Sequence, residues 1–290
     1  MDRGRQQSLA GRVALVTGAS RGIGAAIARR FAAEGAAVAL VARTLDEVGS
    51  NSETLRATAD AIARAGGRAQ PIRADLARAA DRERAVERAV EALGPIDVLV
   101  NNAARADGET LAELRETYEV NAIAPLDLAR RVLPSMREHG EGWILNIGSA
   151  AAQRPEPPYS EFHRTASEAW LHYAATKAAL DRLTSGLAAL HCDANIAING
   201  LTPRGVVVTS RLIEEWGSER IAQLESQSHA VETVEAMAEA ALALCSVSAR
   251  DVTGRNAVCS ALLEELGREV RGLDGQPLHD AGATSAPART

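Results

Sequence analysis

Two patterns of apolar and polar positions follow each other along most of the chain. Short apolar runs, beginning with Arg12–Val16, precede longer segments such as Gly22–Ala33 that read as amphipathic. The first pattern is typical of buried strands and the second of helices with one buried face. Further strands are predicted at Ala37–Ala42, Arg68–Ala74, Ile96–Val100, Trp143–Ile147, Asn195–Leu201 and Asn256–Cys259, and further helices at Ser52–Ala65, Arg82–Leu93, Leu111–Glu138, Thr165–Leu190, Arg211–Gln227 and Thr233–Cys245.

This order of elements predicts a doubly wound α/β fold. Strands that alternate with helices form a parallel sheet, and right-handed crossovers place helices on both of its faces. We therefore expect a Rossmann-type sheet of about seven strands. The pattern has no linker, which indicates one domain over residues 9–262, and the long helical region is expected to bend near Pro125. Residues 1–8 and 272–290 are expected to be flexible termini.

The composition narrows the classes of function. The 290 residues carry a net charge of −6 and contain 3% aromatic residues, which argues against a basic, ring-rich nucleic-acid surface. No apolar run reaches the roughly 18 residues that span a bilayer. Cys192, Cys245 and Cys259 form no CxxC pair, and the six histidines show no metal-ligand spacing. We therefore expect a cytoplasmic protein with buried thiols and no metal, nucleic-acid or membrane partner.

A glycine-rich turn joins the first predicted strand to the first predicted helix. Its sequence is Thr17-Gly-Ala-Ser-Arg-Gly-Ile-Gly24. Gly18 permits a tight turn, Gly22 lets backbone approach a pyrophosphate, and Gly24 allows close packing of helix and strand. The free N–H groups and the positive end of the helix dipole then face the phosphates. The strand–turn–helix context favours this interpretation over a turn whose glycines serve only steric needs.

Candidate acid–base chemistry lies in Tyr173-Ala-Ala-Thr-Lys177. Residues four apart on a helix share a face, so Lys177 and Tyr173 can point into one cleft. An ammonium, together with an oxidised nicotinamide, would lower the tyrosine pKa from its usual value near 10, so that it exchanges a proton with substrate near neutral pH. YxxxK alone also fits a rim tyrosine beside a solvated lysine. Position favours the first reading, because Ser149 ends a strand at the edge where open sheets bind ligands.

These segments resemble the classical short-chain dehydrogenase/reductase family over roughly Leu9–Ser260. The TGxxxGxG spacing at Thr17–Gly24 matches that family rather than the general G-x-G-x-x-G fingerprint. The resemblance implies hydride exchange with a nicotinamide cofactor and interconversion of an alcohol and a carbonyl, with Tyr173 as general acid or base. It also implies that Ser149 orients the substrate oxygen, that Asn121 holds a proton-relay water, and that Lys177 binds the nicotinamide ribose.

The second strand bears on the choice of cofactor. NAD-dependent enzymes usually carry an acid at its end, bonded to the ribose 2′-hydroxyl. Here Ala42 stands at that place and Arg43 follows, with Arg21 on the same side. Because arginine forks bind a 2′-phosphate bidentately, NADP(H) is the preferred cofactor and NAD(H) a possible one. The alternative is that Arg43 is a solvated loop charge.

The resemblance implies further cofactor contacts along the strand ends. Asp75 matches the acid that bonds the adenine amino group, and Asn102 the NNAG segment, whose last glycine is Ala104 here. Asn102 could also tie neighbouring strands together. The complete set of expected cofactor-binding residues is Gly18, Ser20, Arg21, Gly22, Ile23, Gly24, Arg43, Asp75, Leu76, Asn102, Ala103, Tyr173, Lys177, Pro203, Val206 and Thr209.

Two departures from the family pattern lie in the carboxyl half. Ser149 precedes Tyr173 by 24 positions, more than the family spacing, and the extra residues fall within the proline-rich stretch Gln153–Ala169. That density of proline favours an irregular segment, which could be a lid, an interface element or a surface loop. The second departure is Arg204, where the family has a glycine after Pro203, or where one residue is inserted.

The leading hypothesis is an NADP(H)-dependent short-chain oxidoreductase acting on a small alcohol or carbonyl compound. A catalytically idle, cofactor-binding sensor or scaffold is the alternative, and a methyltransferase with a related sheet is a distant third because it has no need of YxxxK. Family members commonly pair through the two long helices, so we expect a homodimer or homotetramer.

Overall fold

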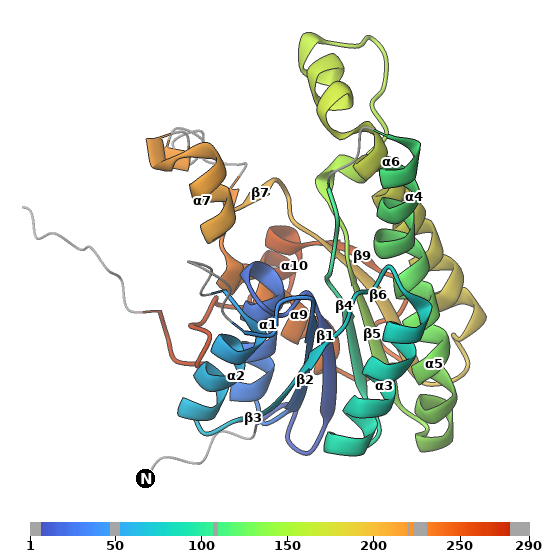
Figure 1. Ribbon diagram of the computed structural model, residues 1–290, viewed down its shortest axis with the longest axis vertical. Coiled ribbons are helices and arrows are strands. Elements are labelled where there is room, and N and C mark those ends of the chain that lie inside the picture. Colours follow the sequence, from blue (N-terminus) through green and yellow to red (C-terminus); the bar gives the residue numbers. More distant parts are fainter. Residues whose placement is uncertain (1–6, 47–52, 107–109, 220, 223–230, 279–290) are drawn as a thin grey trace, which may run out of the picture.

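A computed structural model describes residues 7–46, 53–106, 110–219, 221–222 and 231–278. Seven of its strands form one sheet, in which each pair of neighbours is parallel (Figure 1). The order is β3-β2-β1-β4-β5-β6-β9, as expected for a doubly wound fold. The predicted seven-stranded parallel sheet is therefore confirmed. The strands are β1 Val13–Thr17, β2 Ala37–Ala42, β3 Arg68–Arg73, β4 Val98–Asn101, β5 Gly142–Ile147, β6 Ile196–Thr202 and β9 Asn256–Val258.

Helices cover both faces of the sheet (Figure 1). Alternate residues of β1 point to opposite faces: Ala14 and Val16 pack in one buried cluster, and Val13 and Leu15 in the other. The first cluster takes in α1, α2, α9 and α10, and the second α3, α5 and the end of α6. The helices are α1 Gly22–Ala33, α2 Leu55–Arg64, α3 Ala79–Leu93, α4 Leu111–Tyr118, α5 Ala124–His139, α6 Glu161–Leu190, α7 Ser210–Trp216, α9 Val234–Cys245 and α10 Cys259–Glu265.

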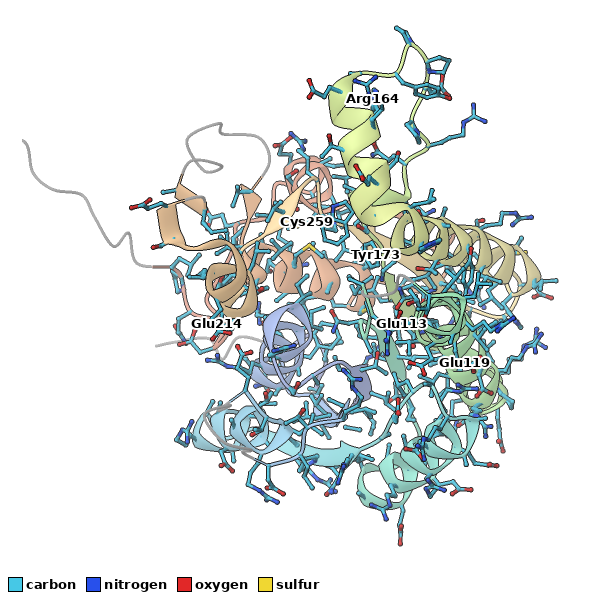
Figure 2. The ribbon with its side chains drawn as sticks, turned by 45° about the horizontal axis from the view of Figure 1, so that its top comes forward. Glu113, Glu119, Arg164, Tyr173, Glu214 and Cys259 are labelled. Carbon is cyan, nitrogen blue, oxygen red and sulfur yellow. The ribbon has the colours of Figure 1, made fainter. Side chains whose placement is uncertain are left out.

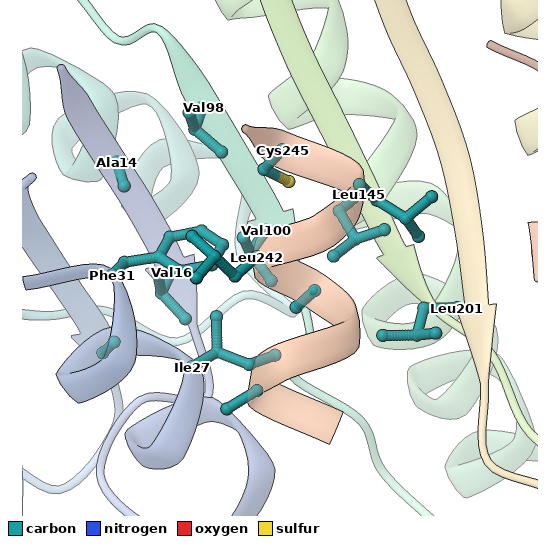
Figure 3. Close-up of a cluster of buried hydrophobic side chains, with 14 of the residues drawn as sticks. Ala14, Val16, Ile27, Phe31, Val98, Val100, Leu145, Leu201, Leu242 and Cys245 are labelled. Atoms are coloured by element: carbon teal, nitrogen blue, oxygen red, sulfur yellow. The ribbon is translucent and has the colours of Figure 1, made fainter. Parts of the chain in front are cut away.

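Helix α9 forms the centre of the first cluster. Its Leu242 is fully buried near Phe31 and Ile27 of α1 and Val16 of β1 (Figure 3). Nine consecutive residues of α9, from Met237 to Cys245, are buried. Burying a large apolar side chain such as Leu242 stabilises the fold by about 2 kcal/mol, so this layer holds α1 firmly beneath the glycine-rich turn.

The long helical region before β5 is interrupted by a π-helical turn just before Pro125. This turn spans Glu119–Ile123 between α4 and α5, and Pro125 is the second residue of α5. Single π turns inside helices often mark functional sites. Here the turn contains Asn121.

Three further features differ from the sequence prediction. Helix α6 begins at Glu161, four residues early, because Ser160 and His163 form a capping box. Cys192 is exposed, so the expectation that all three cysteines are buried was wrong; it follows the end of α6 in a surface turn. The short parallel pair β7 Val206–Val207 and β8 Val231–Glu232 was not predicted.

The chain ends lie partly outside the described residues. Of the termini predicted to be flexible, 1–8 and 272–290, residues 1–6 and 279–290 fall there, as do residues 220 and 223–227 of the predicted helix Arg211–Gln227. Residues 272–278 form a turn in which the Gly272 N–H bonds the carbonyl of Gln276. Within the described part of the chain, no helix is long and apolar enough to cross a membrane.

Candidate active site

The glycine-rich turn has the steric properties expected of a phosphate cradle. Gly18 and Gly22 have φ of +67° and +56°, which side chains other than glycine rarely adopt. A Cβ on Gly24 would lie 2.4 Å from both the carbonyl oxygen of Gly18 and the amide nitrogen of Asn102. Helix α1 starts beyond Arg21, which provides no side-chain cap for the first-turn N–H groups. Donors of this kind fit an anionic diphosphate.

Asn102 ties this turn to the neighbouring strand. Its Nδ2 donates to the carbonyl of Thr17 at 2.9 Å and to that of Gly18 at 3.3 Å. The Thr17 hydroxyl in turn accepts from the N–H groups of Asn102 and Ala103. Asn102 thus ties two neighbouring strands together, which was the alternative role considered for it. Ala103 contacts the same turn through its N–H.

The region where the sequence predicts the 2′-phosphate of NADP(H) contains two arginines and a carboxylate. Arg43 is exposed just beyond β2, and Arg21 lies at the start of α1. An Nη of Arg21 is 3.4 Å from an oxygen of Glu53, a contact that the sequence did not reveal. Ser20 is linked to α2, because the Thr58 hydroxyl donates to its carbonyl.

The adenine side is ordered by local hydrogen bonds. One carboxylate oxygen of Asp75 accepts from the Ala77 N–H at 3.1 Å, and the other lies 3.9 Å from Arg78. Leu76 is buried, and its carbonyl accepts from Arg82. The Asp75 side chain remains half-buried at the carboxyl end of β3, on the edge where the resemblance expects the adenine.

Ser149 and Tyr173 come together although 24 positions separate them. The two side chains are close enough that an interaction with the Ser149 hydroxyl lowers the pKa of Tyr173, and the same hydroxyl accepts from the Ala151 N–H at 3.2 Å. The extra residues do not intervene, because they extend α6 outward from the site (Figure 1). Figure 2 shows Tyr173 at the base of this extension and Arg164 near its far end.

Burial controls the protonation of the tyrosine. It raises the pKa of Tyr173, and the hydrogen bond from Ser149 lowers that pKa in part. We expected Lys177 to lower the pKa of Tyr173 below its usual value. The protein part of that expectation was wrong, because the Lys177 ammonium lies 5.8 Å from the ring centroid and donates instead to the Ile147 carbonyl at 2.7 Å.

Lys177 is the only lysine among the 32 basic residues of the sequence. It is 2% exposed, and burial lowers its pKa to about 8, while Asp181 one turn later raises it. A guanidinium at this position would stay charged, whereas the buried ammonium of Lys177 can lose its proton close to pH 8.

Asn121 in the π turn fixes the loop after β4 to helix α6. Its Nδ2 donates to the Arg105 carbonyl at 2.8 Å and to the Thr176 hydroxyl at 2.9 Å, while its Oδ1 accepts from the Arg105 N–H. Both amide hydrogens are thus used. Thr176, which lies between Tyr173 and Lys177, was not recognised as a site residue, although its position inside YxxxK was a possible signal.

The segment after β6 is anchored by Glu232, which the sequence did not single out. One carboxylate oxygen of Glu232 accepts from the Arg204 N–H at 2.8 Å, and the other from the Ser260 N–H at 2.9 Å. Pro203 is buried and Arg204 is exposed. Beyond β7, where Val206 pairs with Val231, the Thr209 hydroxyl caps α7 and its methyl group faces Gly22.

The residues predicted from the sequence therefore gather along one edge of the sheet. Thr17 and Asn101 end β1 and β4, Ile147 ends β5, and Thr202 ends β6, and these strands are neighbours. The turn at Thr17–Gly24, the segment at Asn102 and the Ser149–Tyr173 pair all follow those ends. Open parallel sheets bind ligands at this edge.

Comparisons with known proteins agree with this arrangement. A model of the short chain dehydrogenase family matches residues 12–220. The ketoacyl reductase HetN of Nostoc sp. is 39% identical over 152 residues, which are 51% of this chain and half of that relative's length. The 7α-hydroxysteroid dehydrogenase of Escherichia coli K12 is 32% identical over 85% of this chain and 92% of its own.

A solved structure extends the similarity to three dimensions. The 3-oxoacyl-(acyl-carrier-protein) reductase of Agrobacterium tumefaciens C58, crystallised with NADP, has a TM-score of 0.72 and 32% identity over 88% of this chain and 96% of its own. The family match, the relatives and the shared fold confirm the resemblance derived from the sequence. The chain belongs to the short chain dehydrogenase family of NAD(P)-dependent oxidoreductases.

Proposed function

We propose that the chain is an NADP(H)-dependent oxidoreductase that interconverts an alcohol and a carbonyl compound through Tyr173. The observation that carries this proposal is the contact between the Ser149 hydroxyl and the Tyr173 phenol, with the Lys177 ammonium 5.8 Å from the same ring. A proton donor, an orienting hydroxyl and a buried cation thus meet at one strand end. This is the set of groups that carbonyl reduction requires.

The preference for NADP(H) is supported by charge. No acid stands at the end of β2, where Ala42 is followed by exposed Arg43, and Arg21 lies on the turn nearby. The structurally similar 3-oxoacyl reductase holds NADP. The turn at Gly18, Gly22 and Gly24 leads into the start of α1, whose first-turn N–H groups have no side-chain cap and suit the diphosphate that both dinucleotides share.

When bound, the nicotinamide cofactor supplies or accepts the hydride. The hydroxyl of Ser149 orients the substrate oxygen beside the phenol, and Tyr173 donates its proton to that oxygen during reduction. Lys177, whose ammonium lies 5.8 Å from the Tyr173 ring centroid, would hold the ribose of the nicotinamide nucleotide. In alcohol oxidation Tyr173 accepts the proton instead. Asn121 acts on this site by fixing Thr176, whose hydroxyl also bonds the Tyr173 carbonyl at 2.7 Å.

The proton-relay water expected at Asn121 could not accept a hydrogen bond from the side-chain amide nitrogen. Both amide hydrogens bond protein groups, so a water could use only a backbone carbonyl of the π turn or the second lone pair of Oδ1. The homodimer or homotetramer expected from the resemblance stays a prediction.

The experiment is a paired assay of Tyr173→Phe and Tyr159→Phe with NADPH and a panel of aldehydes and ketones. Tyr159 is 62% exposed and serves as the matched control. We expect Tyr173→Phe to lower turnover by about 10²–10⁴-fold with NADPH affinity retained, and Tyr159→Phe to leave both unchanged. Equal turnover in the wild type and Tyr173→Phe would overturn the role of Tyr173. A wild-type chain that binds NADPH but turns over no substrate in either direction would favour the idle sensor.

A further inference from the structure

The carboxylate of Glu53 is held between the glycine-rich turn and helix α7. One of its oxygens is 3.4 Å from Nη1 of Arg21, and the other accepts a hydrogen bond from the Ser210 hydroxyl. Ser210 is the first residue of α7, so Glu53 joins two elements that lie more than 180 positions apart in sequence. Figure 1 shows α7 on the same side of the molecule as α1 and α2.

The backbone around Glu53 is anchored as well. Thr54, which follows it, is 1% exposed and caps α2 by accepting from the Ala57 N–H. One turn later, the Thr58 hydroxyl bonds the Ser20 carbonyl in the glycine-rich turn. The start of α2 is therefore docked on the turn, and Glu53 is 27% exposed beside an Arg21 that is 42% exposed. The Glu53–Arg21 contact is therefore held in place by the backbone around it, unlike an ion pair between two freely moving surface side chains.

Arg21 is also the arginine that the proposed function assigns to the 2′-phosphate of NADP(H). The phosphate and the Glu53 carboxylate are both anions, so they compete for one guanidinium and repel each other. NAD(H) carries a hydroxyl in place of the 2′-phosphate, so its binding does not require Arg21 to leave Glu53. We propose that Glu53 is a specificity-determining residue that weakens the preference for NADP(H) over NAD(H) by occupying Arg21. This inference rests on the proposed function and adds a residue that opposes it.

The test is a titration of the wild-type chain and Glu53→Gln with NADPH and with NADH, followed by cofactor fluorescence. The matched control is Glu265→Gln, because Glu265 pairs with Arg255 just before β9, at the amino edge of the sheet. We expect Glu53→Gln to bind NADPH about three- to tenfold more tightly at low salt, and NADH within about twofold of wild type. Glu265→Gln should match the wild type for both dinucleotides.

Two further measurements test whether Glu53→Gln acts through competition for Arg21 or through some other effect of the substitution. The gain for NADPH should shrink in 0.5 M salt, at roughly half the Debye length of physiological buffer, since the contact is partly exposed. It should also fall below about twofold in an Arg21→Gln background, because the competition is for Arg21.

An unchanged NADPH affinity in Glu53→Gln, an equal gain for NADH, or a full gain without Arg21 would each overturn the inference while leaving the proposed function intact. A wild-type chain that binds neither dinucleotide would overturn the proposed function and this inference with it.

Discussion

The two halves of the site differ in how closely their sequence determines their structure. On the nucleotide side, Gly18, Gly24 and Asn102 meet within 3.3 Å, and α1 and β2 have the bounds predicted from the sequence. On the substrate side, the segment 153–169 extends away from the fold, and the segment after β6 forms a small sheet that was not predicted. Steric requirements of the backbone leave few sequences possible in the first half, whereas exposed side chains in the second are less constrained.

The two halves also differ in which part of the chain forms them, backbone on the nucleotide side and side chains on the substrate side. The glycine-rich turn is defined by positive φ and by space, and both belong to the backbone. The Ser149–Tyr173–Lys177 group depends instead on side chains of the segment after β5 and of α6, whose connection is longer than in the family. The three side chains lie together despite that longer connection, because the added residues extend α6 at its start and leave its YxxxK turn in place.

The largest effect is expected from Gly24→Ala on the nucleotide side. A Cβ there would lie 2.4 Å from the Gly18 carbonyl, so backbone must move, and we expect about 3 kcal/mol of lost stability together with lost NADPH binding. Gly186→Ala in α6 is the control, since its nearest neighbour is the flexible end of Arg182 and helix propensity should add up to about 1 kcal/mol. Denaturant unfolding measures both. Equal stability of the two variants would show that the turn tolerates a side chain.

The next effect concerns the buried ammonium of Lys177. Its folded pKa of about 8 lies below the unfolded value, so the unfolded chain binds the extra proton between these values. The wild type should therefore gain stability as pH rises from about 8 to about 10.4, and Lys177→Met should be more stable by about 1–2 kcal/mol at pH 7 although inactive. This difference should shrink through the same pH range.

The pKa itself can be read directly, because Lys177 is the only lysine in the chain. Protein grown with ¹³C-lysine gives one Cε signal, and its titration should have a midpoint of about 8. A midpoint near 10.4, the ordinary lysine value, would contradict the burial that the structure shows.

A smaller effect is expected at the start of α6, on the substrate side. Ser160→Ala removes the cap that accepts from the His163 N–H, and should cost about 1 kcal/mol, confined to the exposed first turns. Hydrogen exchange should accelerate there while NADPH affinity stays unchanged. Weaker NADPH binding in Ser160→Ala would mean that the extension is coupled to the cofactor site.

The smallest effect is expected from Arg204→Gly, which restores the family's dipeptide. The Arg204 side chain is exposed, and Glu232 bonds only its backbone N–H. Unfolding stability should change by less than about 0.5 kcal/mol, and turnover by less than about twofold. A tenfold change in turnover would give this side chain a direct role toward substrate.

Much of this structure could be predicted because local patterns and steric needs agree. The strands follow from unbroken apolar runs such as Ala37–Ala42, and YxxxK identified Tyr173 and Lys177 from their spacing. Glu53 and Glu232 could not be found this way, since each acts through contacts made far along the chain. Thr176 lies inside YxxxK, but its bond to Asn121 is likewise a contact between distant segments. The sign of the Tyr173 pKa shift was also missed, because burial and the path of the Lys177 side chain are tertiary properties.

The central claim is that Tyr173 completes a hydride exchange between NADPH and a carbonyl. It is tested most directly by incubating the chain with NADPH that carries deuterium at both C4 positions and a substrate from the carbonyl panel, and analysing the alcohol by mass spectrometry. The account predicts one deuterium on the carbinol carbon, with product formation about 10²–10⁴-fold slower in Tyr173→Phe. An alcohol without deuterium, or one formed equally fast by Tyr173→Phe, would contradict it.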